Sequence, residues 1–435
     1  MAGEWKETSL AAVMDVKHGF AFPGENIRDE PPGDILLTPG NFAIGGGFKG
    51  DKFKYFDGEV PEDFVLKEGE LVLTMTDLSK QADTLGYPAI IPNPRSQRFL
   101  HNQRLGKVLI KRGAELDRGF LFYLLRTAEY RNEVLASATG TTVKHTSPGR
   151  ILAHKANLPP LAEQKAIAAV LGALDDKNEL NRRMNATLEA MARALFQSWF
   201  VDFDPVRAKL DGRKPIALDE TTAALFPSTF DETAVGHIPH AWRVGSIYEI
   251  SNVIYGAPFA SSLFNAEKLG KPLIRIRDLP NESPAVFTTE VHTKGYLLQP
   301  GDIAVGMDGE FRAYLWAGVE SWLNQRCCVF APKPGFSAAF VRNSIIAPLA
   351  QVEATETATT VIHLGKNDID RFTVIIPDAP VAEAFRRKCQ PWYDQIVANK
   401  QQSRTLATLR DTLLPKLLSG ELSVGALDDG PEVAV

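Results

Sequence analysis

The most regular pattern of apolar and polar positions lies in residues 161–200. Apolar or amide side chains recur there at separations of about four and three residues, which is the spacing of a coiled-coil seam. The positions that we assign to this seam are Ile167, Leu171, Leu174, Asn178, Asn181, Leu188, Met191 and Leu195. The pattern predicts one long helix, in which the polar stretch Asn178–Asn185 fixes the register rather than adding stability.

The same stripe returns near the C-terminus, at Leu406, Leu409 and Leu413. Two long helices with one apolar face each are expected to pair, and the alternative is that each helix packs separately on its own domain. Because a whole domain lies between them in the chain, an antiparallel pair would place two domains at opposite ends. We therefore predict an antiparallel coiled coil formed by residues 159–200 and 379–420.

The remaining sequence shows short apolar runs separated by turn residues, a pattern that predicts strands. Asp34–Thr38 and Glu70–Met75 are such runs, and helical spacing over Phe120–Leu135 predicts one or two helices that pack on them. A later region repeats this plan with strands expected at Lys271–Ile276, Gly301–Val305 and Arg326–Phe330. An α+β fold class follows.

The chain contains this plan twice. Trp5 and Ser9 recur as Trp242 and Ser246. The other recurring motifs pair Asn102–Arg104 with Asn324–Arg326, Thr139–His145 with Thr357–His363, and Leu158–Pro159 with Ile376–Pro377. The period is too long for a solenoid. It predicts two homologous domains in a pseudo-twofold arrangement, which suits a target with two halves. The expected ranges are 1–158 and 238–378 for the domains, 201–237 for a linker and 421–435 for a tail.

Composition and charge narrow the class of protein. The formal net charge is −5, so the chain does not bind DNA through a uniformly basic surface. The charge is uneven, because residues 91–155 hold 12 Lys and Arg against 4 Asp and Glu. The longest apolar run, Ala166–Leu174, is shorter than the ~20 residues that cross a bilayer, and no secretory signal is visible, so a cytoplasmic protein is expected. Cys327 and Cys328 are expected to be buried free thiols.

Motifs for catalysis are missing from the sequence. It has no Walker A motif, no Asn/Asp-Pro-Pro-Tyr/Phe motif and no histidines at metal-ligand spacing. Gly45–Gly50 does not lead into a βα unit, so we interpret it as a hairpin loop rather than a phosphate cradle. His145 and His363 recur without a nucleophile or carboxylate beside them, which favours structural or DNA-contacting histidines over catalytic bases. We expect no metal site.

Several segments closely resemble the specificity subunit of type I restriction–modification systems. These segments are Leu158–Ile167, Ala194–Gly212, Thr221–Pro227, Gly236–Trp242 and Leu406–Leu422. The resemblance covers the whole chain, including both copies of the repeat. One departure is Asp378–Glu383, which lacks the full Pro-Pro-Leu-x-Glu-Gln start of the first long helix.

The resemblance implies a subunit that is not an enzyme. Its two target recognition domains would each recognise one half of a bipartite double-stranded DNA sequence, and the coiled coil would set the spacer between the halves. Two modification subunits, which carry S-adenosylmethionine and methylate adenine, would bind it, and restriction subunits would join them. This chain itself would hold no cofactor and contact no membrane. A scaffold that only recruits partner proteins, and a fused nuclease or methyltransferase, are the alternatives.

Base recognition requires forked side chains, such as Arg on guanine and Asn or Gln on adenine. Residues that recur in both copies are expected to support the fold or bind phosphates, because the two domains should recognise different sequences. They are Arg104, Thr141, Thr142, Lys144 and His145, with Arg326, Thr359, Thr360 and His363. Residues at positions where the copies differ are the candidates for specificity, with surface salt bridges as the alternative for each arginine. They are Thr38, Asn41 and Lys80, with Arg275, Arg277, Asp278 and Arg312.

Overall fold

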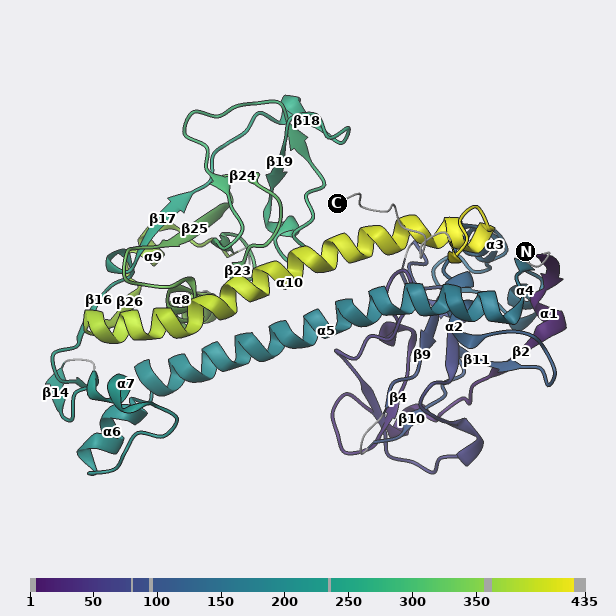
Figure 1. Ribbon diagram of the computed structural model, residues 1–435, viewed down its shortest axis with the longest axis horizontal. Helices are drawn as coiled ribbons and strands as arrows, with labels where there is room; N and C mark the ends of the chain where they lie inside the picture. Colours follow the sequence, from purple (N-terminus) through teal and green to yellow (C-terminus); the bar gives the residue numbers. More distant parts are fainter. Residues whose placement is uncertain (1–4, 80, 94–96, 234–235, 356–361, 426–435) are drawn as a thin grey trace, which may run out of the picture. The chain divides into compact units, whose positions relative to one another are not determined.

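The computed structural model (Figure 1) divides the chain into two compact units. Unit 1 comprises Met1–Asp176 and Leu406–Val435, and unit 2 comprises Lys177–Thr405. Each unit therefore contains one globular region and a part of each long helix, a grouping that cuts across the domain ranges expected from the sequence. The structure describes residues 5–79, 81–93, 97–233, 236–355 and 362–425. The expected tail lies largely outside these ranges.

Unit 1 contains two β-sheets made of short strands. The four-stranded antiparallel sheet has the order β2 (Met14–His18), β11 (Leu105–Ile110), β7 (Leu71–Thr74) and β9 (Pro88–Ile90). The five-stranded sheet has the order β3 (Ile27–Arg28), β5 (Lys54–Phe56), β4 (Asp34–Leu36), β10 (Phe99–Leu100) and β6 (Val65–Leu66). Two further pairs are β1 (Lys6–Ser9) with β13 (Lys155–Leu158), and β8 (Thr76–Asp77) with β12 (Lys144–His145).

Unit 2 contains two sheets of the same kind. The four-stranded sheet has the order β17 (Ser251–Tyr255), β25 (Cys327–Pro332), β22 (Ile303–Gly306) and β23 (Ala313–Leu315). The five-stranded sheet has the order β18 (Phe264–Asn265), β20 (Phe287–Thr288), β19 (Lys271–Ile274), β24 (Ser321–Leu323) and β21 (Leu297–Leu298). Two further pairs are β16 (Arg243–Ser246) with β26 (Thr373–Ile376), and β14 (Phe230–Thr233) with β15 (Gly236–Pro239).

The two globular regions share one topology. Their four-stranded and five-stranded sheets correspond strand by strand, and in each five-stranded sheet one pair is parallel, β4 with β10 and β19 with β24. The strand that precedes each long helix, β13 or β26, pairs with the first strand of its own domain, β1 or β16. The motifs that recur in the sequence therefore reflect two domains with the same topology. The predicted α+β class is confirmed.

Other helices accompany these sheets. They are α1 (Leu10–Val13), α2 (Arg118–Leu124), α3 (Ala128–Ala136) and α4 (Pro148–Leu152) in unit 1, and α6 (Asp204–Leu210), α7 (Glu220–Ala224), α8 (Ala338–Thr355) and α9 (Lys366–Ile369) in unit 2. The 3-10 helices are η1 (Gly24–Asn26), η2 (Pro39–Asn41), η3 (Glu62–Phe64), η4 (Ile247–Glu249), η5 (Ser261–Leu263) and η6 (Ile276–Asp278). Two N-caps explain why the predicted helical stretch forms both α2 and α3, because Asp117 accepts from Phe120 N and Thr127 accepts from Tyr130 N.

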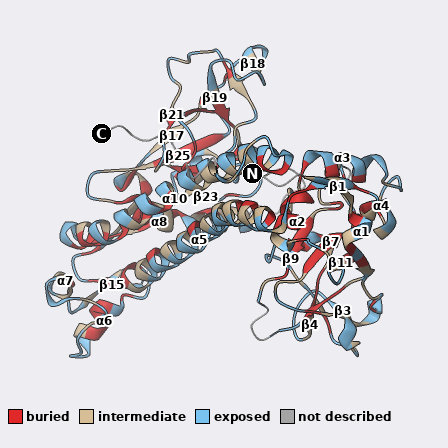
Figure 2. Cartoon of the chain, turned by 45° about the vertical axis from the view of Figure 1, so that its right-hand side comes forward, coloured by how far each residue is buried: buried red, intermediate tan, exposed pale blue. Residues whose placement is uncertain are grey.

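The core of each unit joins a sheet, its helices and the long helices. In unit 1 the buried side chains of Phe120 and Tyr130 pack in one cluster with Ile167 and Leu417. Figure 2 shows buried residues gathered on β7, β9, β11 and α2 of this unit. In unit 2 a cluster of aromatic rings, including Trp199, plays the same part.

The segment expected to be a linker is packed. It contains α6, α7 and β14, and Phe203, Val206 and Phe226 in it are buried in the core of unit 2. The segment was expected to be a linker, but these three apolar side chains give it a hydrophobic face to bury.

The long helices are α5 (Leu161–Phe200) and α10 (Ala379–Ser419), and within each unit they run antiparallel (Figure 1). In unit 2, Asn181 Nδ2 donates to Gln402 Oε1 at 2.9 Å and Asn399 Nδ2 donates to Asn185 Oδ1 at 2.9 Å. Residue numbers therefore rise along one helix as they fall along the other, and the predicted antiparallel pair is confirmed. No helix of the described residues is both long and apolar enough to span a membrane.

Two of the predicted seam positions are wrong. Met191 is 43% exposed and Leu409 is 44% exposed, whereas Ala192 is buried. In α5, steps of four, three and four residues from Asn181 lead to Ala192 and not to Met191. In α10, the same steps from Asn399 lead to Arg410 and not to Leu409. Each wrong assignment chose the large apolar residue that lies next to the true seam position. Ile167, Leu171 and Asn181 are buried as predicted, and Leu174, Asn178, Leu188, Leu195, Leu406 and Leu413 are partly buried.

Candidate nucleic-acid interface

Three recurring segments of the first domain meet at Met75. Its backbone N–H donates to the carbonyl of Arg104 at 2.8 Å, and its carbonyl accepts from Thr146 N at 3.0 Å. Directly after Met75, strand β8 pairs with β12, so that Lys144 lies opposite Asp77 in the ladder. The Asn-Gln-Arg turn and the Thr-Thr-Val-Lys-His hairpin, which are far apart in the sequence, are therefore adjacent in space.

The second domain builds the same junction around Met307. Its backbone N–H donates to the carbonyl of Arg326 at 2.9 Å, and its carbonyl accepts from Leu364 N at 2.8 Å. The next residue, Asp308, forms an antiparallel bridge with His363. The recurrence of these motifs in the sequence is thus explained, because they form one cluster in each domain.

In the first domain, Asp77 fixes the shape of the loop that follows β8. Its carboxylate accepts from the backbone N–H of Ser79 and from both the N–H and the hydroxyl of Thr84, each at 2.6 Å. Burial raises the pKa of this carboxyl, but the hydrogen bonds from Thr84 and Ser79 outweigh burial and hold the pKa below its usual value. In the loop held this way, Leu78 is 63% exposed.

In the second domain, Asp308 collects two basic side chains. Its Oδ1 lies 2.7 Å from Nδ1 of His363 and 3.5 Å from Nη1 of Arg326. The two clusters therefore share a backbone arrangement but differ in charge, because Thr76 lies opposite His145 in the first cluster and the carboxylate of Asp308 lies opposite His363 in the second. Such a difference is what two domains with different targets require.

The recurring candidates in the described part of the chain lie at these clusters. Arg104, Thr141, Thr142 and His145 are exposed, and Lys144 is partly buried. In the second domain, Arg326 and His363 have side chains that are about half exposed. Lys80, Thr359 and Thr360 lie outside the described residues. The hydroxyl of Thr76 lies 3.2 Å from Nδ1 of His145, which orients that ring.

Two of the specificity candidates support a turn instead of facing outward. Asn41 is buried, and its side chain donates to the carbonyl of Lys52 at 2.8 Å and accepts from Thr38 N at 2.9 Å. Asp278 occupies the same place in the second domain, is 4% exposed, and accepts from Arg275 N at 3.0 Å. We therefore remove Asn41 and Asp278 from the candidates for base contact, because their polar atoms are used within the turn.

The three candidate arginines of the second domain differ in their partners. The guanidinium of Arg275 bonds Asp278, with Nε 3.0 Å from Oδ2. Arg312 donates to Glu353 at 2.8 Å and also contacts Glu310, so it forms the surface salt bridges that were the alternative to base contact. Arg277 is exposed and forms no ion pair with any other described residue. Among the described specificity candidates, Arg277 is the side chain that is most available to a ligand.

The sequence interpretation overlooked the residues that shape the two clusters. Asp77 lies two residues after Met75 and Asp308 lies one residue after Met307, and this nearness to the equivalent methionines was the signal that could have identified them. Leu78 could have been noticed as an apolar residue within a polar loop. The first residue of each Asn-Gln-Arg triplet also proves to be local, since Asn102 accepts from Arg104 N at 3.0 Å and Asn324 accepts from Arg326 N at 3.3 Å.

This arrangement defines a class of protein. Cationic side chains, hydroxyls and an exposed apolar side chain stand together on loops held by a rigid sheet, which suits contact with phosphates and base edges. No group of three or more His, Cys, Asp and Glu side chains within the described ranges is placed to hold a metal ion. The fold and clusters are those of a tandem nucleic-acid recognition protein built from two similar domains and a helical connector.

The family comparison agrees with this class. The type I restriction modification DNA specificity domain matches residues 2–190 and again residues 239–388. These matches cover most of the chain and coincide with the structural repeat. The chain belongs to this family.

Relatives and a solved structure extend the match. The chain is 28% identical over 359 residues to the type I restriction enzyme HindI specificity subunit of Haemophilus influenzae, covering 70% of this chain and 77% of that one. It is 26% identical over 458 residues to the MjaIX specificity subunit of Methanocaldococcus jannaschii, covering 98% of each. The crystal structure of a type I S subunit from M. genitalium has a TM-score of 0.57 at 16% identity, covering 95% of this chain and 96% of that chain, and so shares the fold.

Proposed function

We propose that this chain is the DNA sequence-specificity subunit of a type I restriction–modification enzyme. Each recognition domain binds one half of a bipartite double-stranded DNA target, and the coiled coil sets the spacer between the halves. The observation that carries this proposal is the duplicated cluster around Met75 and Met307, which has a common backbone but different side chains. Two such clusters in one chain match a target whose two halves have unrelated sequences.

The direct test is the pattern of modified adenines in DNA. Cells that express the chain with its modification subunit are expected to methylate one discrete bipartite motif, and cells without the chain are expected to lose it. Exchange of residues 1–158 for a related domain should change one half of the motif only. The proposal would be overturned, in favour of a scaffold that recruits partners, by either of two results. The motif could stay methylated in cells without the chain, or both of its halves could change after the domain exchange.

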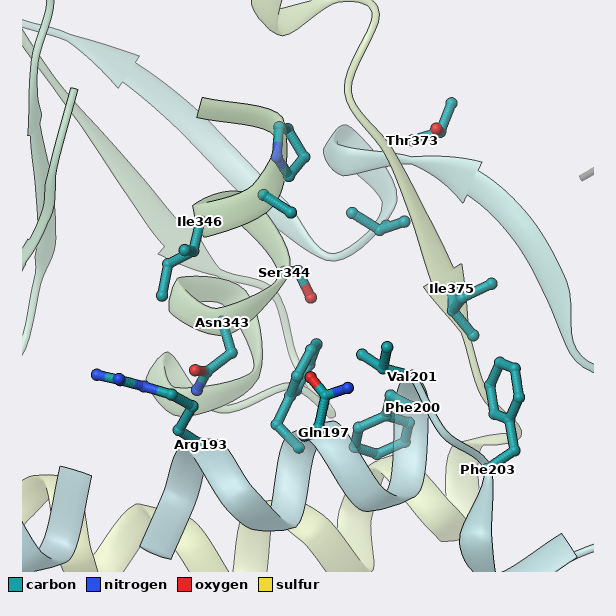
Figure 3. A pocket seen from close by; sticks show the side chains of 14 residues that line it. Arg193, Gln197, Phe200, Val201, Phe203, Asn343, Ser344, Ile346, Thr373 and Ile375 are labelled. Atoms are coloured by element: carbon teal, nitrogen blue, oxygen red, sulfur yellow. The ribbon is translucent and has the colours of Figure 1, made fainter. Parts of the chain in front are cut away.

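A groove in unit 2 supports the binding of a partner subunit. It has a volume of about 680 Å³ and lies between α5, α8 and β26. In Figure 3, Gln197 and Phe200 on α5 face Asn343 and Ile346 on α8. Ile346 is 43% exposed, so the groove presents apolar surface to solvent. We assign this groove to a modification subunit.

Unit 1 contains a smaller groove at the corresponding place. It has a volume of about 230 Å³ and is lined by β13 and by Pro415, Leu418 and Ser419 of α10. These three residues occupy the positions in the repeat that Gln197, Phe200 and Val201 occupy in α5. Strands β13 and β26, which line the two grooves, are also equivalent in the repeat. Two corresponding grooves support a complex with two modification subunits.

The chemistry of the complex is assigned to the partners. We propose that this chain is not catalytic, that the modification subunits bring S-adenosylmethionine and methylate adenine, and that restriction subunits join the assembly. We place the complex in the cytoplasm, where its DNA substrate lies. The partner subunits also supply phosphate contacts, which explains how a subunit with a formal net charge of −5 works on DNA.

Arg277→Ala is expected to relax recognition at one base pair of one half-site. Arg277 is exposed without an ion pair among the described residues, and a bidentate arginine contact contributes ~1–3 kcal/mol to discrimination between bases. The methylated motif of the variant, determined by long-read sequencing, should gain degeneracy at that position. Arg312→Ala is the control, because Glu353 already occupies its guanidinium. An unchanged motif in Arg277→Ala would contradict the assignment.

A further inference from the structure

The second recognition domain is attached to helix α10 by a buried carboxylate. Glu282 is 8% exposed, and its Oε1 accepts from Lys400 Nζ at 2.9 Å while Oε2 accepts from Arg404 Nη1 at 2.6 Å. The same two cations also donate to the carbonyls of Leu315 and Ala317 at the end of β23. One glutamate thus joins a loop and a strand of the domain to the helix.

The backbone at this glutamate is unusual. Glu282 has a φ of 52°, in the left-handed region that side chains other than glycine adopt at a cost. Its Oε1 also accepts from Ala317 N at 3.2 Å, so the side chain is held from both the domain and the helix. A strained residue that is fixed by several partners is typical of a place where geometry matters to function.

The first domain is attached to both long helices through one shared aspartate. Arg126 of that domain is paired with Asp175 of α5 at 3.0 Å, and Asp175 is also paired with Arg410 of α10 at 2.6 Å. Arg126 Nε donates to the carbonyl of Gly45 at 2.6 Å. Each domain therefore contributes a cation to a carboxylate of α5, Arg126 to Asp175 and Arg342 to Glu189 at 3.4 Å, and in unit 2 the domain adds the anion Glu282 to α10.

We propose that Glu282 is a positioning residue that holds the second recognition domain in one orientation on α10 and so restricts the spacer lengths that the enzyme accepts. This inference rests on the proposed function. Each base pair added to a spacer moves a half-site by about 3.4 Å along the DNA and turns it by about one tenth of a helical turn. A domain fixed by a buried carboxylate and its two partly buried cations cannot follow that displacement, whereas a loosened domain can.

The test uses the full chain assembled with its modification subunit. Duplexes carry the natural bipartite target or the same half-sites with a spacer one base pair longer or shorter, and methylation rates are compared. In Glu282→Gln, the rate on the altered spacers relative to the natural spacer is expected to rise about tenfold. A general loss of folding lowers all three rates together and leaves this ratio unchanged, which would overturn the proposal.

Two further variants separate positioning from stability. Glu320→Gln removes a carboxylate that pairs with Lys271 inside the same domain, and it should leave the spacer ratio unchanged. Glu282→Lys combined with Lys400→Glu and Arg404→Glu reverses the polarity and should restore the natural spacer preference. Restored stability without restored preference would refute the role of Glu282. Absence of methylation of the natural target by the unaltered complex would instead refute the proposed function.

Discussion

Asp175→Ala is expected to lower the free energy of unfolding by about 3–5 kcal/mol, because it leaves two buried arginines without their shared anion. The side chains of Arg126 and Arg410 are 9% and 19% exposed, and the phenol of Tyr123 also donates to Asp175 at 3.0 Å. Burial raises the pKa of Asp175, but the hydrogen bond from Arg410 and the charge of Arg126 outweigh burial and lower it. The carboxylate is therefore ionised and structurally required at neutral pH.

Urea denaturation followed by circular dichroism measures this loss. Glu179→Ala is the matched control on the same helix, because Glu179 forms an exposed pair with Arg182 three residues away, and such pairs contribute about 0.5 kcal/mol or less. The difference between the variants should therefore be several-fold. Equal effects would mean that the triad around Asp175 is no stronger than a surface ion pair.

Trp199→Ala is expected to destabilise the chain by about 3–5 kcal/mol, the range for truncation of a large buried aromatic side chain. Trp199 is 1% exposed and packs edge-on against Phe226, with ring centroids 4.9 Å apart. It also contacts Phe385 of α10, so its loss opens a cavity at the centre of the unit 2 core. Denaturation in urea provides the measurement.

Met191→Ala is the matched control for Trp199→Ala. Met191 lies on the same helix and was predicted to face the seam, but its side chain is 43% exposed. Substitutions at such surface positions change stability by about 0.5 kcal/mol or less. A loss of several kcal/mol from Met191→Ala would mean that this side chain packs in the seam as the sequence predicted.

The long helices could be predicted from the sequence because their signal is periodic. Asn181 was predicted as a polar seam residue, and its side chain donates to the carbonyl of Asn399 in the polar layer between the helices. The error at Met191 arose because hydrophobicity alone does not identify a seam position when a small residue such as Ala192 occupies it. Whether a residue is buried depends on whether it faces the partner helix and not on the size of its side chain.

The recognition clusters could be predicted only in part. Recurrence identified the segments that contain Arg104, His145 and their counterparts, but it did not indicate that these segments meet around Met75. That proximity depends on long-range strand pairing, which local sequence does not encode. Asn41 and Asp278 were misjudged for a related reason, since polar side chains that close a turn look the same in sequence as polar side chains that bind a ligand.

The Glu282 anchor on α10 has a consequence for how this protein can change. A recombination event could copy one domain into the place of the other. If the first domain replaced the second, Lys400 and Arg404 would face Gly45 at the place of Glu282, and two partly buried cations would lose their counter-ion. New specificities should therefore arise by exchange between like positions of different chains, which keeps each domain with the charge of its own helices.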